Sequence, residues 1–302
     1  MAIQYAGGTN INTTFTNSSS PTRREIVDGV VSALSSAGWS TVSGGGTGDV
    51  LMESATTPQG LKCRVRCFDP GSGNTARFYL RSAGITAAAG TFGSGLLPEA
   101  GKTWRVIANR YQAFVFVPST VASRNYVAFG SLYIMPTFAS QIYECCWMWG
   151  SANGDTDTAN RPHFRWVLGS NQNFSTAESC FILNGNMVEI GNGTNWGGNG
   201  SPGNATLIYP QPPAAAYQGK SQYANRFHDD SPIIAEPLMA FGLAQGDEAK
   251  IRGQLWDAII LTDAMSMGTQ FTFDSHTFHN ITHNNQGLIN QCHRGSLLVV
   301  VP

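Results

Sequence analysis

Charged residues are scarce in this chain of 302 residues, since Asp, Glu, Lys and Arg together make up only 12% of it. Typical globular proteins contain about 25%. The formal net charge is -1 at pH 7, which argues against nucleic-acid binding because that function needs a strongly basic surface. A freely soluble monomer usually keeps its net charge away from zero, so the composition favours a protein whose surface is covered in an assembly.

Long apolar runs and paired cysteines are also lacking. No apolar run reaches the roughly 18 residues that a membrane-spanning helix needs, so no such helix is predicted. Residues 1–20 contain no basic segment followed by an apolar one, and no signal peptide is expected. The six cysteines form no CxxC pair and show no zinc-binding spacing. Without a secretion signal, we expect reduced and buried thiols.

Glycine is abundant, with 34 residues, and together with serine and asparagine it disfavours helices, so the composition favours strands and loops. One helix is nevertheless predicted between residues 22 and 38. Thr22 and Glu25 form a capping box, and Gly38 is a suitable C-terminal stop. An apolar stripe at helical spacing lies between them and consists of Ile26, Val27, Val30, Val31 and Leu34. This helix is expected to lie across one face of a sheet.

Residues 61–69 and 75–82 alternate between apolar and charged side chains, as the strands of a half-buried hairpin do. The hairpin would place five cations on one face: Lys62, Arg64, Arg66, Arg77 and Arg81. One interpretation is a solvated sheet face whose charges discourage aggregation. The other is a docking surface for an acidic partner or a negatively charged polymer.

Strand patterns and turn residues continue to the end of the chain, apart from a Gly-rich connector at 83–103. The sequence therefore predicts a mainly β (α+β) protein. Residues 1–85 would form a small antiparallel sheet with the N-terminal helix packed on it. Residues 86–302 would form a larger β-sandwich or barrel-like domain with a long, irregular Gly/Pro-rich arm at 191–232.

Aromatic residues punctuate this predicted arm. They are Trp196, Tyr209, Tyr217 and Tyr223. Aromatic side chains in long loops serve as anchors at protein interfaces, where tyrosine and tryptophan are enriched. They could also stack on sugar rings, which would suit a module that binds a glycan on a bacterial surface.

Histidines gather near the end of the chain, where His276, His279 and His283 have the spacing HxxHxxxH. Zinc sites need imidazoles that project together, whereas His276 and His279 would project to opposite faces of a strand. They are weak metal candidates, and we expect ordinary polar histidines. No nucleophile motif accompanies His228, Asp229 and Asp230. The sequence therefore predicts neither an enzyme nor a cofactor.

Two segments carry a family resemblance. The ending "GQLWDAIILTDAMSMGTQFTFDSHTFHNIT…RGSLLVVVP" resembles the ends of virion structural proteins of tailed bacteriophages, and residues 18–67 look similar to an N-terminal module of the same group. The resemblance implies a building block of the tail, neck, baseplate or head surface, and it carries over no site residues. It leads us to expect a β-rich virion protein, assembled in the host cytoplasm, whose partners are its own copies and other virion proteins. A tail-side position is favoured over the alternative of a head decoration protein, and a receptor-binding module for a host surface glycan is a further alternative.

Overall fold

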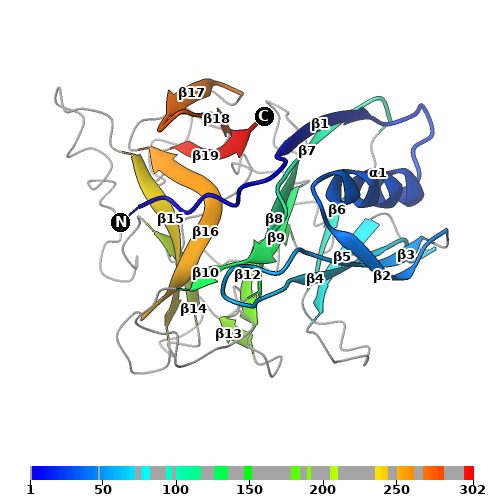
Figure 1. Ribbon diagram of the computed structural model, residues 1–302. Helices are drawn as coiled ribbons and strands as arrows, with labels where there is room; N and C mark the ends of the chain where they lie inside the picture. Colours follow the sequence, from blue (N-terminus) through cyan, green and yellow to red (C-terminus); the bar gives the residue numbers. More distant parts are fainter. Residues whose placement is uncertain are drawn as a thin grey trace, which may run out of the picture.

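The computed structural model describes residues 2–46, 48–71, 76–81, 93–96, 100–116, 126–134, 146–151, 178–183, 189–191, 205–209, 235–243, 250–261, 268–281 and 296–302. Over these ranges the chain forms one helix and three antiparallel sheets (Figure 1). The predicted mainly β (α+β) class is confirmed. No helix in the described ranges is long and apolar enough to cross a membrane.

The central sheet, here called sheet A, has seven strands in the described part of the chain. Each strand is antiparallel to its neighbours. Their order is β1 (Ile11–Thr16), β7 (Thr103–Ala108), β8 (Gln112–Phe116), β9 (Tyr126–Ser131), β11 (Cys146–Ser151), β12 (Glu178–Leu183) and β13 (Glu189–Gly191). Strand β1 comes from the N-terminal part of the chain, where the sequence had indicated no strand.

The smaller sheet, sheet B, contains the predicted hairpin. Its order is β2 (Ser40–Gly44), β3 (Asp49–Glu53), β4 (Arg64–Phe68), β5 (Ala76–Arg81) and β6 (Gly93–Leu96). Strand β6 corrects the prediction that residues 83–103 are only a connector, because its backbone pairs with β5 from Ala76↔Leu96 to Tyr79↔Gly93. Short glycine-rich segments can form an edge strand where long-range backbone pairing satisfies their polar groups.

The third sheet, sheet C, combines distant parts of the sequence. Its order is β14 (Ala205–Tyr209), β15 (Ala235–Leu243), β16 (Lys250–Leu261), β19 (Ser296–Val301), β18 (His276–Asn280) and β17 (Gln270–Phe273), and β10 (Tyr133–Ile134) also pairs with β16. The prediction of an irregular arm over 191–232 is wrong at β14, which pairs with β15 in the register Leu207↔Phe241. The largely apolar sequence Ala-Thr-Leu-Ile-Tyr from Ala205 to Tyr209 suits a strand, and the glycines and prolines around it obscured this in the sequence.

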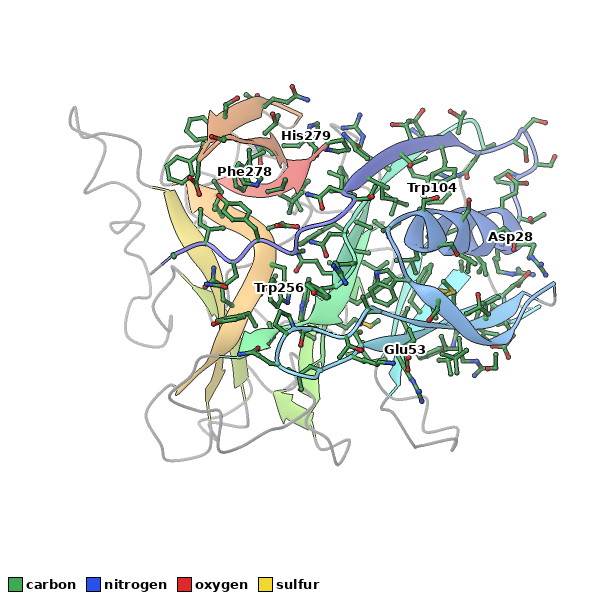
Figure 2. All side chains as sticks on the ribbon, viewed as in Figure 1. Asp28, Glu53, Trp104, Trp256, Phe278 and His279 are labelled. Atoms are coloured by element: carbon green, nitrogen blue, oxygen red, sulfur yellow. The ribbon has the colours of Figure 1, made fainter. Side chains whose placement is uncertain are left out.

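Helix α1 (Arg23–Ser36) begins at the predicted cap. The Thr22 side chain accepts from the Glu25 backbone N–H, and the Glu25 carboxylate accepts from the Thr22 N–H, so the capping box is confirmed. Gly38 follows the helix with a φ of 93°, which glycine adopts without strain. The helix lies between sheet B and the β1–β7 edge of sheet A, next to Trp104 (Figures 1 and 2).

One apolar core joins α1, sheet B and one face of sheet A. It contains Val30 and Leu34 of the helix, Val65 and Phe78 of sheet B, and further residues of β7, β8, β9 and β11. The predicted alternation in the first hairpin strand is confirmed, since Leu61, Cys63, Val65 and Cys67 are all buried. Residues on both sides of the predicted domain boundary at 85 therefore share this core. The thiols of Cys63 and Cys67 are buried within it and form no disulfide.

The opposite face of sheet A turns toward sheet C. Alternate residues of β7 and β8 point that way, and two of them, Arg105 and Gln112, contact β18 and β16 respectively. The segment at residues 2–6 runs from sheet C towards β1 (Figure 1). It is joined to β16 by a backbone hydrogen bond from Asp257 N–H to Gln4 O of 2.8 Å.

Candidate functional site

The predicted cationic face lies on sheet B, opposite the side covered by α1. Strand register places Arg64 across from Arg81 and Arg66 across from Tyr79. The neighbouring strand β3 adds the carboxylates of Glu53 and Asp49 to the same face. The face is therefore built from three strands and carries both signs of charge.

Three of the five cations are paired with these carboxylates. Lys62 Nζ and Arg64 Nε both donate to Glu53, with a Lys62–Glu53 distance of 2.6 Å. Arg66 donates two hydrogen bonds of 2.6 Å to the two oxygens of Asp49. Burial alone would raise the pKa of Glu53, but the hydrogen bonds from Lys62 and Arg64 hold it below its usual range.

Arg77 donates to the Tyr79 hydroxyl at 3.2 Å, and Arg81 ends β5. The charges of Lys62, Arg64 and Arg66 are largely satisfied within the sheet, which favours a charge-paired outer face over an open cationic patch. Docking of an acidic partner at this face stays a prediction.

The histidines of β18 contact different neighbours. The His276 ring stacks on Tyr5, with ring centroids 3.9 Å apart, and its Nδ1 lies 2.6 Å from the Asp274 carbonyl oxygen. His279 instead lies 2.7 Å from Arg105 Nη1 through its Nε2. His283 lies outside the described residues. Among the residues that the structure does describe, no three His, Cys, Asp or Glu side chains gather closely enough to hold a metal ion.

His279 is 5% exposed and sits between sheet C and sheet A (Figure 2). The Arg105 guanidinium can only donate, so His279 Nε2 accepts and the neutral ring carries its proton on Nδ1. Burial, together with the Arg105 charge, lowers the pKa of His279 to about 4. This histidine is therefore neutral at physiological pH and joins the two sheets.

The aromatic residues of the predicted arm are only partly located. Tyr209 is the last residue of β14 and is paired with Met239. Trp196, Tyr217 and Tyr223 lie outside the described residues. Their roles as interface anchors or sugar-stacking residues stay predictions.

A buried polar cluster joins the N-terminal segment, the β7–β8 turn and β16. Asp257, 3% exposed, accepts from Ala6 N–H at 2.9 Å and from Asn109 Nδ2 at 2.6 Å. The Asn109 side-chain oxygen accepts from the backbone N–H groups of Tyr111 and Gln112. Burial raises the pKa of Asp257, although the hydrogen bonds from Ala6 and Asn109 oppose the rise.

Gln112 extends this cluster with two bonds to Trp256. Its Oε1 accepts from the Trp256 N–H at 3.2 Å, and its Nε2 donates to the Trp256 carbonyl. The Tyr111 and Trp256 rings pack beside these bonds, with centroids 4.6 Å apart. Because Asp257 and Gln112 are sealed from solvent, the cluster can position strands but cannot receive a substrate.

Sequence reasoning missed this cluster. A single signal was present in "LWDAIIL", where Asp257 interrupts an otherwise apolar run. A charged residue inside a buried strand is rare unless it is paired, so the position of Asp257 in this run indicates a buried carboxylate with hydrogen-bond partners. Its partners Asn109 and Ala6 are distant in sequence, and no local pattern identifies them.

Two outer strands expose large apolar side chains. Val42 of β2 is 43% exposed and Phe273 of β17 is 39% exposed, and these are the large hydrophobic residues in the described ranges that lie open to solvent. Each belongs to the outermost strand of its sheet. Such edges can pair with another chain. No family model and no curated protein matches this sequence.

Proposed function

We propose that this chain is a structural subunit of a tailed-phage virion, in the tail, neck or baseplate, that acts by symmetric self-association and not by catalysis. The observation that carries the proposal is an uncharged, exposed sheet edge at β17 on a protein whose net charge is -1. Copies of such a chain meet with little electrostatic repulsion. The virion setting rests on the resemblance of residues 18–67 and 253–302 to phage structural proteins.

The titratable groups of the described core support a mechanical role. Asp257 and His279 are buried, and they join sheet C to the β7–β8 turn through Asn109 and to β7 through Arg105. Glu53 is held by two cations of its own sheet. These side chains have the surroundings of structural groups, with their hydrogen-bonding capacity directed at neighbouring elements.

Sedimentation velocity of the full chain over a concentration series tests self-association. We expect an oligomer of fixed size, and a chain that is monomeric at every concentration would reject the proposal. Labelling of purified particles with an antibody against the chain tests its position. Label on the tail, neck or baseplate supports the proposal, whereas label confined to the head would make it a head decoration protein.

A further inference from the structure

Strand β17 is the outermost strand of sheet C and is exposed at three of its four residues. It pairs with β18 on one side, from Gln270↔His279 to Phe273↔His276, and with no described strand on the other. Gln270, Thr272 and Phe273 are exposed, and Phe271 is half-buried. The sequence Gln-Phe-Thr-Phe contains no charge and no proline.

The hairpin geometry determines which backbone N–H and C=O groups of β17 point toward β18 and which point away from it. Asp274 and Ser275 have φ values of 49° and 62°, so the turn between β17 and β18 is a two-residue turn with both central residues in the left-handed region. The closing pair, Phe273 and His276, is hydrogen-bonded in such a turn, and the pairs then alternate along an antiparallel ladder. The N–H and C=O groups of Gln270 and Thr272 therefore point away from β18.

The side chains of β17 form an aromatic face that continues into the core. Phe271 and Phe273 stack with ring centroids 6.4 Å apart. Phe271 also packs against the buried cluster of Ile259, Phe278 and Val300. A strand added beside β17 would extend the apolar face that Phe271 forms with Ile259, Phe278 and Val300 of sheet C.

The other edges with described side chains differ from β17. Strand β2 contains a bulge at Val42, between the pairs Thr41↔Met52 and Ser43↔Leu51, and bulges protect edges from pairing. Strand β1 directs its Phe15 ring onto Trp104, at a centroid distance of 4.3 Å, and exposes no large apolar side chain. Strand β17 alone among these three combines a regular ladder, an absence of charge and an exposed aromatic ring.

We propose that two copies of this chain join edge to edge through β17, so that sheet C continues across a two-fold axis. This rests on the proposed function and names the surface through which copies associate. Antiparallel pairing sets Gln270 of one copy opposite Thr272 of the other, which uses their outward groups in roughly four backbone hydrogen bonds. Phe271 then faces its own counterpart on the axis, with Phe273 diagonally beside it.

A second copy is the occupant because the surface is complementary to itself. A two-fold contact brings the same patch from both subunits together, and it is the commonest arrangement in homo-oligomers. The uncharged strand introduces no repulsion across the axis, whereas a charged residue at position 271 would face its own copy. The contact covers Phe273, which is 39% exposed in the isolated chain.

Phe273→Lys in the full-length protein tests this contact by sedimentation velocity beside the wild type. We expect the dimer of this variant to dissociate at least roughly 10-fold more readily than the wild-type dimer, because a lysine replaces the aromatic ring that lies diagonally beside Phe271 of the other copy and brings a charge into the contact. Val42→Lys is the matched control, because it also replaces an exposed apolar side chain with lysine, but on edge strand β2 of sheet B. This variant should leave the dimer intact. Thr272→Lys repeats the test without removing Phe273, and circular dichroism confirms that each variant is folded.

The outcomes separate this inference from the proposed function. A wild-type oligomer that survives both Phe273→Lys and Thr272→Lys overturns the β17 contact and leaves self-association standing. A Val42→Lys dimer that dissociates as readily as the Phe273→Lys dimer would also overturn the β17 contact, because a lysine outside the proposed interface would then have the same effect. A wild-type chain that is always monomeric overturns both proposals.

Cysteine cross-linking tests the register. Hydrogen-bonded antiparallel pairs have Cα atoms about 5.5 Å apart, within the range that a disulfide spans. A mixture of Gln270→Cys and Thr272→Cys proteins should form a covalent dimer on oxidation, more readily than either variant alone or the wild type with its six native cysteines. Equal cross-linking in all four samples would overturn the proposed pairing.

Discussion

At β7 and β8, sheet A is covered on both faces, but the two faces are built differently. Toward α1 and sheet B the contacts are apolar, and the helix approaches so closely at Gly29 that an added Cβ would lie 2.7 Å from Trp104. Toward sheet C, buried contacts include hydrogen bonds made by Gln112 and Arg105. The sheet C side adds directional hydrogen bonds to apolar burial, since Phe114 and Phe116 of β8 are buried there as well.

This difference has a physical basis. Apolar contacts are non-directional, so a core of valines and phenylalanines tolerates small shifts of one sheet over another. A buried hydrogen bond is satisfied in one arrangement only, and an unmet donor costs about 1–3 kcal/mol. The cluster around Asp257 and Asn109 therefore selects a single position for sheet C, while the apolar contacts on the α1 side contribute burial without such directionality.

The largest effect is expected on the apolar face. Trp104→Ala should lower the free energy of unfolding by about 3–5 kcal/mol, because it leaves a cavity between α1, Phe15 and sheet A. Gly29→Ala should destabilise the wild type through overpacking but stabilise the Trp104→Ala protein, where helix propensity adds about 1 kcal/mol. Urea denaturation measures both, with the exposed Ser32→Ala as control. Equal effects of Gly29→Ala in both backgrounds would contradict the close packing.

The next largest effect is expected in the polar cluster. Asp257→Gly should lower the free energy of unfolding by about 2–3 kcal/mol, since Ala6 N–H and Asn109 Nδ2 lose their acceptor. Glycine suits the φ of 50° at this position, so the loss reports the carboxylate and not the backbone. Asp257→Asn, which keeps an acceptor for Ala6, should lose less. A fully stable Asp257→Gly protein in thermal and urea unfolding would show that the cluster contributes nothing.

A smaller, pH-dependent effect is expected at His279. Its pKa is lowered to about 4 in the folded protein from an ordinary value of 6.5, so the unfolded chain binds a proton first as the pH falls. Stability should therefore decline from about pH 6.5 down to about pH 4. His279→Gln should flatten this decline in a series of melting temperatures against pH. His276→Gln, on the same strand, should retain it, and identical profiles for the two variants would contradict the assignment.

The smallest effect is expected on the outer face of sheet B. Lys62→Met should change the free energy of unfolding by less than about 1 kcal/mol, because exposed ion pairs contribute little and the Lys62 side chain is 41% exposed. The change should shrink further in high salt. Urea denaturation at low and high salt checks this, with Lys62→Arg as the charge-preserving control. A loss matching that of Asp257→Gly would mean that this face also fixes strand positions.

Local patterns in the sequence were enough to predict the elements but not their assembly. The capping box at Thr22 and Glu25, and the alternation from Leu61 to Cys67, depend on neighbours within a few residues, and both are present. Strand β1 could not be recognised, because its polar alternation becomes a strand only by pairing with β7 almost 100 residues later. The same holds for β6 and β14, whose pairing partners, and not their own composition, decide their structure.

The candidate surfaces show the same limit. The cations of β4 and β5 were identified, yet the carboxylates of Asp49 and Glu53 that neutralise them were not, since strand register decides which charges meet. Strand alternation predicts opposite faces for His276 and His279, which contact Tyr5 and Arg105 respectively, but the Arg105 partner of His279 is 174 positions away in the sequence. Long-range contacts of this kind have no signature in a single sequence.

The bond between Ala6 and Asp257 links residues 251 positions apart, which orders events during synthesis. A ribosome needs roughly 12–50 s to make that stretch at 5–20 residues per second. Throughout this interval Ile3 and Tyr5 have no apolar surface of sheet C to pack against, because β16 has not been synthesised. The N-terminal segment can dock only after the strands of sheet C near the end of the chain have been synthesised. Its docking is therefore a late step in the folding of the protein.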